Sequence, residues 1–175
     1  GWPVWQAFID SLPVTRSIVI ESGETGWEKI VSAFAAARAI GAPVSIAYAV
    51  QGCMSALAIA GAAAAARWAS PAVRGAATCA AALLSTPYAL DYDLVILGGA
   101  ICFLVADGRA RGWLAHEKSL LAIAYLMPLF ARQLAGLTLV PVAWLVTLTV
   151  FALALRRGWV LDMRARLPLP ARLAG

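Results

Sequence analysis

Long apolar runs separated by charged residues are the main pattern of this chain. The uncharged stretches cover residues 39–66, 75–90, 94–106, 119–131 and 133–155. A membrane-spanning helix needs about 20 predominantly apolar residues, and flanking Lys and Arg side chains can reach the interface from within a span. The pattern therefore predicts an all-α fold, a polytopic transmembrane helical bundle of about five spans. We place these spans near residues 42–66, 72–89, 90–107, 114–132 and 136–155.

Residues 1–41 lack such a run and follow a different pattern. Thr25–Glu28 has the form of a capping box, in which two side chains satisfy free backbone N–H groups at a helix start. Trp27 and Phe34 are seven residues apart and would share one helical face. The region therefore predicts an amphipathic interfacial helix over residues 26–40, lying on the exterior side of the membrane.

Composition supports a membrane location, and the distribution of Lys and Arg predicts which segments face the cytoplasm. Hydrophobic residues make up 62% of the chain and charged residues 13%, whereas soluble domains carry about 25% charged residues. Lys and Arg collect on the cytoplasmic side of membrane proteins. With the N-terminal region outside, ten Lys and Arg residues fall on the inner side and four on the outer side. We therefore expect an exterior segment over 1–41, the bundle over 42–157 and a cytoplasmic basic tail over 158–175.

Several partner classes find no support in the sequence. The formal charge of +5 does not indicate nucleic acid, because the basic residues sit between apolar runs and form no basic–aromatic patch. Cys53, Cys79 and Cys102 fall inside apolar runs, and His116 has no ligand neighbour at metal spacing. We expect no cofactor, no metal and no nucleic acid, and we expect contacts with membrane lipids.

The segment 85–94 carries two carboxylates, Asp91 and Asp93, between two apolar runs. At the centre of a spanning helix each Asp would cost about 2.5–3.5 kcal/mol. The pair is therefore expected near the membrane surface or facing a watery cavity. Pro87 ends a helix because it lacks a backbone donor, and the alternation of spans places this corner on the outer side.

Two interpretations of the corner stay open. It is a polar hairpin between two spans, for which Pro and Asp are ordinary residues. Alternatively, it binds a substrate. Tyr88 and Tyr92 lie four residues apart, so on a helix they would face together, with Asp91 beside Tyr88. Tyrosine rings pack on sugars and carboxylates accept hydrogen bonds from sugar hydroxyls, which makes Asp91, Asp93, Tyr88 and Tyr92 candidate substrate-binding residues.

Arg38 and Gln51 are two further candidates for substrate binding. Arg38 shares the helical stripe of Trp27 and Phe34, where an apolar residue is expected. Its guanidinium binds a lipid phosphate or, alternatively, caps the helix C-terminus. Gln51, inside the first predicted span, lines a polar cavity or bonds to a neighbouring helix. Arg132 is interpreted as an interfacial anchor.

Three segments together resemble the C-terminal half of glycosyltransferase family 87, a family of multi-spanning membrane enzymes. They are Gly26-Trp-Glu-Lys-Ile-Val-Ser-Ala-Phe-Ala-Ala-Ala-Arg38, Ala47-Tyr-Ala-Val-Gln51 and Thr86-Pro-Tyr-Ala-Leu-Asp-Tyr-Asp-Leu-Val95. The resemblance implies a hexosyltransferase of the bacterial plasma membrane. Such an enzyme would move a hexose, mannose-like in type, from a polyprenyl-phosphate-linked sugar donor to a lipid or glycan acceptor on the outer face.

The resemblance also implies where the general base lies. In this superfamily the main catalytic carboxylate usually sits in a first exterior loop that is not recognised here. The sequence begins with Gly1, so we expect a C-terminal fragment that is inactive alone, in which Asp91 and Asp93 position the substrate. The alternative is a transporter or flippase-like protein with Asp91 and Asp93 as its polar site. Such proteins show repeated halves and acids near the midplane, whereas these acids fall at a span end.

Overall fold

The computed structural model describes residues 1–24, 26–138 and 142–163, and this part of the chain is helical almost throughout. The α-helices are α1 (Trp2–Thr15), α2 (Ala33–Ala39), α3 (Val44–Trp68), α4 (Pro71–Leu84), α5 (Val95–Arg111), α6 (Glu117–Leu126), α7 (Pro128–Thr138) and α8 (Val142–Gly158). Three short non-α segments lie between them, η1 (Arg16–Glu21), η2 (Trp27–Lys29) and η3 (Asp91–Leu94), and a fourth, η4 (Trp159–Met163), follows α8. The described residues contain one isolated β-bridge and no strand. The predicted all-α bundle is confirmed.

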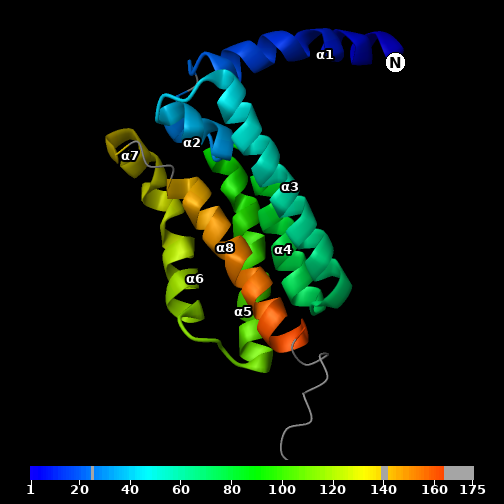
Figure 1. Cartoon of the computed structure of the whole chain (residues 1–175), viewed down its shortest axis with the longest axis vertical. Coiled ribbons are helices and arrows are strands. Elements are labelled where there is room, and N and C mark those ends of the chain that lie inside the picture. Colours follow the sequence, from blue (N-terminus) through cyan, green and yellow to red (C-terminus); the bar gives the residue numbers. More distant parts are fainter. Residues whose placement is uncertain (25, 139–141, 164–175) are drawn as a thin grey trace, which may run out of the picture.

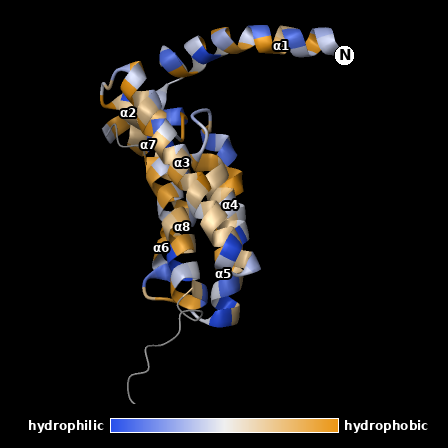
Figure 2. Cartoon of the chain, turned by 45° about the vertical axis from the view of Figure 1, so that its right-hand side comes forward, coloured by the Kyte–Doolittle hydropathy of each residue, from blue (hydrophilic) through white to orange (hydrophobic). Residues whose placement is uncertain are grey.

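Helices α3 to α8 form a bundle of helices that run in alternate directions (Figure 1), and polar contacts hold both of its ends. At the corner end (residues 85–94), the Ser55 hydroxyl lies 2.7 Å from the carbonyl of Ser85. At the network end (Ser70, Asp107, Glu117 and Arg157), the Ser70 hydroxyl donates to Asp107 over 2.9 Å. Hydropathy follows the same division, because hydrophobic residues dominate the middle of the helices and hydrophilic ones gather towards the ends (Figure 2).

Helix α4 is the most enclosed helix of the bundle. It packs against α3, α5 and α8, and its buried residues are Val73, Ala76, Ala77, Ala80, Ala81, Leu83 and Leu84. Small side chains let helix backbones approach closely, which explains how three neighbours fit around one helix. The helix begins with Pro71 at its first position, where the missing N–H costs nothing, and Ser70 accepts a hydrogen bond from the N–H of Val73.

The five predicted spans correspond to α3, α4, α5, the α6–α7 pair and α8, which run in alternate directions. By length and composition, two helices of the described chain are long and apolar enough to cross a membrane: α3, and α8 continued to Met163. The α6–α7 pair makes a third if its 74° bend lies within one span. Helices α4 and α5 have 14 and 17 residues, or about 21 and 26 Å, which is less than the ~30 Å hydrocarbon core. The number of five therefore stays a prediction.

The N-terminal region differs from the predicted amphipathic helix. Instead of one helix over 26–40, the chain forms the short turn η2, an extended link at Ile30, and then α2. The helix start is capped by Ser32, whose hydroxyl accepts from the N–H of Ala35 at 3.1 Å, while Thr25 lies outside the described residues. Most of α2 is buried. The reason is that residues 30–31 pair with the corner, which requires extended backbone where a helix was expected.

Helix α1 was not predicted. It lies at the corner end of the bundle and projects well to one side of it (Figure 1). Its apolar residues, including Trp2 and Trp5, are exposed. Tryptophan at such positions suits a membrane interface, where an indole can be half wet.

Candidate functional site

The corner end is fixed to α2 and α3 by one buried amide. Gln51 is 3% exposed. Its Nε2 donates to the carbonyl of Leu84 at 3.1 Å and its Oε1 accepts from the N–H of Phe34 at 3.1 Å. A third hydrogen bond joins Nε2 to the Ser55 hydroxyl at 3.1 Å. Of the two interpretations of Gln51, the bond to neighbouring helices is the one observed, and its amide has no free donor for a ligand.

A short backbone pairing holds the other side of the corner. Ile30 and Leu90 form an antiparallel bridge, and the N–H of Val31 donates to the carbonyl of Ala89 at 2.7 Å. Asp93 then accepts from the N–H of Leu90 at 2.9 Å, so its carboxylate caps η3. Asp93 is therefore engaged in positioning the backbone.

Of the two carboxylates at the corner, that of Asp91 is the one that stays accessible to a ligand. Its Oδ2 lies 3.9 Å from Nη1 of Arg132, and the two side chains are 39% and 55% exposed. Exposed ion pairs at this distance contribute little to stability. Both charged groups therefore stay available to an incoming ligand.

The bend between α6 and α7 brings Arg132 to the corner. Pro128 is the first residue of α7, and the two helices meet at 74°. Proline breaks a helix because it lacks the N–H and clashes with the preceding turn. Without the bend, α7 would continue along the axis of α6 and away from η2, against which it packs.

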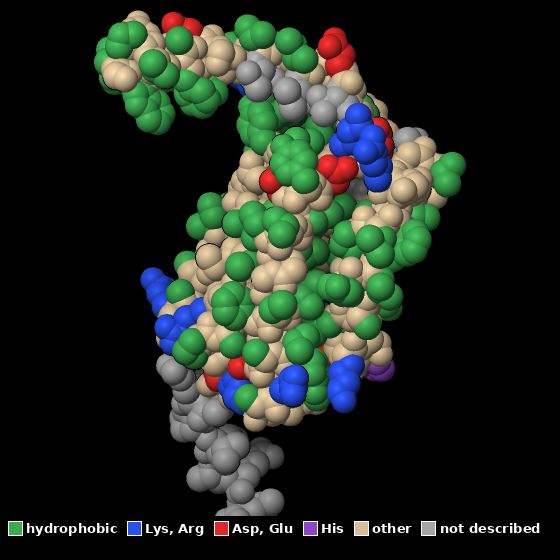
Figure 3. All heavy atoms as spheres, turned by 180° about the vertical axis from the view of Figure 1, so that it is seen from behind, with side chains coloured by type: hydrophobic (Ala, Val, Ile, Leu, Met, Phe, Trp, Pro, Cys, Tyr) green, Lys and Arg blue, Asp and Glu red, His purple; other side chains and the backbone are tan. Residues whose placement is uncertain are grey.

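Two cavities flank this ion pair. One has a volume of about 590 Å³ and is lined by Glu28, Arg132, Gln133, Gly136 and Leu137. The other, of about 290 Å³, is lined by Asp91, by Tyr125 and Pro128, and by apolar residues of α5. Acidic and basic side chains gather over this end of the molecule, while the middle is largely uncharged (Figure 3). The site thus offers one guanidinium and two carboxylates beside open space.

The two tyrosines do not share a helical face. Helix α4 ends at Leu84, and the bridge at Leu90 interrupts the helix between Tyr88 and Tyr92. Both rings are exposed, Tyr92 at 70%. Within the described residues neither hydroxyl makes a hydrogen bond, so both can meet a ligand. Their predicted alignment on one helix is not found.

Arg38 lies in the last turn of α2, and its guanidinium bonds to carbonyls outside that helix. Its Nη1 donates to the carbonyl of Ala42 at 2.8 Å and its Nη2 to that of Glu21 at 3.2 Å. The guanidinium carbon sits 5.3 Å from the ring centroid of Trp27. Arg38 therefore ties η1, α2 and the start of α3 together, and it is half-buried in doing so.

Two residues of the site were missed by sequence reasoning, Arg132 and Glu28. Arg132 was interpreted as an interfacial anchor. A signal was present, because it is the one charged residue between positions 119 and 155 and it follows a helix-breaking proline. A charge in such a place needs an acidic partner or water. Glu28 was interpreted only as the acidic member of a capping box.

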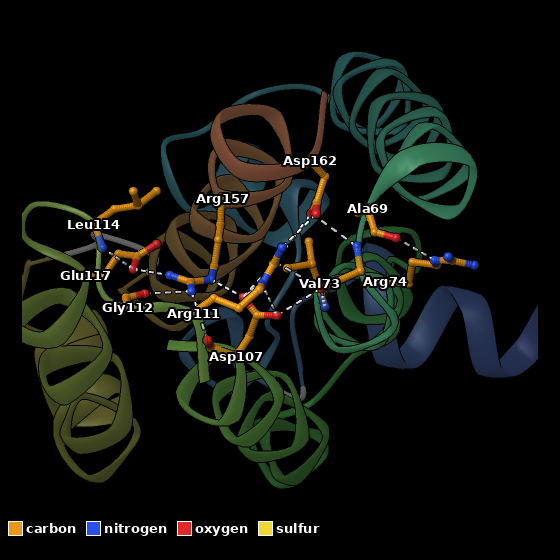
Figure 4. A network of polar contacts seen from close by, with 11 residues as sticks. Ala69, Val73, Arg74, Asp107, Arg111, Gly112, Leu114, Glu117, Arg157 and Asp162 are labelled. Carbon is orange, nitrogen blue, oxygen red and sulfur yellow. Dashed lines mark hydrogen bonds and ion pairs between the residues drawn. The ribbon is translucent and has the colours of Figure 1, made fainter. Parts of the chain in front are cut away.

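A second polar cluster occupies the network end (Figure 4). Arg157 of α8 is 1% exposed and donates to Asp107 and, at 2.6 Å, to Glu117. Its Nη2 also donates to the carbonyl of Gly112 at 2.8 Å. Arg111 bridges Asp107 and Asp162, with 2.8 and 2.7 Å contacts. Asp107 thus pairs with Arg111 of its own helix and with Arg157 of α8, because buried charges are tolerated only when paired.

The comparisons with known proteins agree with the resemblance in the sequence. The model of glycosyltransferase family 87 matches residues 1–90, just over half of the chain. No curated protein and no solved structure matches the chain. The matched part includes α1 to α4 and the first half of the corner. Asp91, Arg132 and the charged residues of the network end lie beyond it. On this match, the chain belongs to glycosyltransferase family 87.

Proposed function

We propose that this membrane glycosyltransferase uses the corner end to hold a polyprenyl-phosphate-linked hexose and passes the hexose to a lipid or glycan acceptor. Family membership supports glycosyl transfer in a membrane. The observation that carries the finer proposal is the loose pair of Asp91 and Arg132 beside two cavities.

The chemistry of the pair fits a phosphate-linked sugar. Arg132 offers a planar guanidinium that hydrogen-bonds phosphate oxygens. Asp91 accepts hydrogen bonds from sugar hydroxyls, and the exposed ring of Tyr92 can pack on a sugar face. On transfer, the acceptor hydroxyl oxygen bonds to the sugar C1, and the bond from C1 to the phosphate oxygen breaks with its electron pair going to that oxygen. The hydroxyl proton passes to a general base, the carboxylate that the family resemblance places in another exterior loop. Negative charge grows on the leaving phosphate, and a fixed cation stabilises it.

The membrane orders both reactants. Donor and acceptor lie in one plane at the bilayer surface, which lowers the entropic cost of bringing them together. We propose that the corner end faces the exterior of a bacterial plasma membrane and that the network end and residues 158–175 face the cytoplasm. Arg109 and Arg111 in the last turn of α5 and Lys118 in the first turn of α6 support this direction. In this assignment Asp91 and Glu28 position substrates.

The position of the acids favours glycosyl transfer over transport. A transporter would hold its ion-binding acids near the bilayer midplane on interrupted helices. Here Asp91 lies at the end of the bundle beside Arg132, and Asp93 caps η3.

The test uses the full-length protein, reconstituted with a polyprenyl-phosphate sugar and a lipid acceptor. Asp91→Asn and Arg132→Gln should each lower sugar transfer about tenfold or more, as expected for losing a hydrogen bond to a charged group. The matched controls are Asp10→Asn on α1 and Arg67→Gln on α3, which are exposed at other places. Wild-type transfer rates in both corner variants would refute the proposal.

A further inference from the structure

We propose that the groove between α5 and α6 binds an anionic phospholipid, whose acyl chain fills the groove and whose phosphate contacts Arg109 and Lys118. This site is separate from the sugar-transfer site and does not depend on it. The occupant is a phospholipid of the leaflet that adjoins the network end.

The groove is apolar along most of its length. It has a volume of about 620 Å³, and its apolar lining includes Gly98, Ile101, Cys102, Leu121 and Ala122. Small residues open it: a Cβ added at Gly98 would meet no atom within 4 Å. A hollow of this composition is suited to a hydrocarbon chain.

Two cations stand at its network end. Arg109 and Lys118 both belong to the lining and are exposed. Lys118 is held in place by Trp113, whose ring centroid lies 5.5 Å from Nζ, a favourable cation–π contact. Trp113 in turn packs directly on the backbone of Gly108, where even a methyl group would clash at 2.7 Å.

These cations have no carboxylate to neutralise them. The neighbouring acids, Asp107 and Glu117, are bound to Arg111 and Arg157. Among the described residues, neither Arg109 nor Lys118 forms an ion pair, and no Asp or Glu belongs to the lining. The groove therefore presents uncompensated positive charge at one end, which complements the phosphate of an anionic lipid.

A second apolar groove in the molecule lacks the two cations and serves as a comparison. It lies between α3 and α4, has a volume of about 440 Å³, and is lined by alanines, Ile59, Thr78 and Ser85 without a charged residue. An acyl chain fits either groove, but only the one between α5 and α6 can select an anionic headgroup. At its far end, that groove adjoins the cavity of Asp91, whose lining includes no Lys or Arg, so the headgroup belongs at the network end.

Native mass spectrometry of the full-length protein tests the headgroup preference. The probes are phosphatidylglycerol and phosphatidylcholine with identical chains. Wild-type protein should retain phosphatidylglycerol on the order of tenfold better, given the attraction of two cations. Arg109→Gln combined with Lys118→Gln should abolish the preference. The control pair, Arg67→Gln with Arg74→Gln, removes the same charge from exposed positions on α3 and α4 and should keep it.

A second variant tests the groove itself. Cys102→Trp fills the hollow and should lower phosphatidylglycerol retention, whereas Cys53→Trp on the exposed face of α3 should not. Equal retention of both lipids by wild-type protein would overturn the proposal. It would also be overturned if the control pair lost the preference as fully as the Arg109/Lys118 pair. A groove filled by another helix, or by polyprenyl phosphate that phosphatidylglycerol cannot displace, would overturn it as well.

Discussion

Arg157 at the network end is 1% exposed and makes charged contacts with Asp107 and Glu117, while Arg132 at the corner end is 55% exposed and stands 3.9 Å from Asp91. At each end, an arginine links two segments that are distant in sequence. Within the network, Asp107, Glu117 and Arg157 are each hydrogen-bonded to other groups of the protein. At the corner end the charges are only loosely paired and lie beside cavities.

This difference in burial and pairing distinguishes charged residues that stabilise the fold from charged residues that can bind a substrate. A buried and saturated arginine cannot meet a ligand without breaking its own contacts, and its removal leaves unpaired acids in an apolar place. An exposed pair adds little to stability but can exchange its partner for a substrate. The free energy of unfolding should therefore respond to changes at the network end, and sugar transfer to changes at the corner end.

The largest expected effect on stability comes from Arg157→Met. It leaves Glu117 buried without its cation and Asp107 with Arg111 alone, which should cost about 3–5 kcal/mol of unfolding free energy. Thermal unfolding of the full-length protein in detergent measures it. Arg156→Met is the control, because Arg156 is exposed and makes a single contact, to the carbonyl of Ala115. An unchanged melting temperature for Arg157→Met would mean that the network does not contribute to the stability of the fold.

Gln51→Leu should have the next largest effect. The change leaves the N–H of Phe34 and the carbonyl of Leu84 without partners, and a buried unsatisfied group costs about 1–3 kcal/mol. Because the corner loses its support, sugar transfer should fall too. Gln6→Leu on α1 serves as the exposed control. Wild-type stability and activity would show that the corner is held without this amide.

A smaller loss is expected for Asp93→Ala, which removes the cap of η3. Caps of this kind contribute about 1 kcal/mol. Asp93→Asn keeps an oxygen acceptor for the N–H of Leu90, so it should retain both stability and most sugar transfer. This result would distinguish Asp93 from Asp91. If Asp93→Asn lowered transfer as strongly as Asp91→Asn, Asp93 would belong to the substrate site.

The smallest effect on stability is expected for Asp91→Asn and Arg132→Gln. Each should change the unfolding free energy by less than about 1 kcal/mol, although each lowers sugar transfer strongly. A double variant should lose little more stability than either single one. A large loss of stability in these variants would place the pair with the network as a structural contact.

Much of the fold could be predicted from the sequence, because the apolar runs dictate helices wherever they occur. The start of α3 near Val44 and the break at Pro87 follow from local residue types. The expected helix over 26–40 failed because residues 30–31 pair with Ala89 and Leu90. That pairing joins segments about 60 positions apart, and no local pattern records it.

The candidate site was found only in part, for the same reason. Asp91 was recognised because a carboxylate between apolar runs is costly wherever it sits. Its partner Arg132 belongs to another helix, and their meeting depends on the 74° bend between α6 and α7. Asp93 was selected beside Asp91, yet the turn of η3 directs its carboxylate back to the chain.

The sequence by itself determined the membrane location, the helices and the polar corner, since hydropathy and helix-breaking residues act locally. The tertiary structure decided which charges meet. Asp107 with Arg157, and Asp91 with Arg132, are 50 and 41 positions apart, and each contact depends on how helices rotate, bend and pack around α4. Coulomb attraction at a few ångströms is strong, but only the packing of the whole bundle sets which groups come that close.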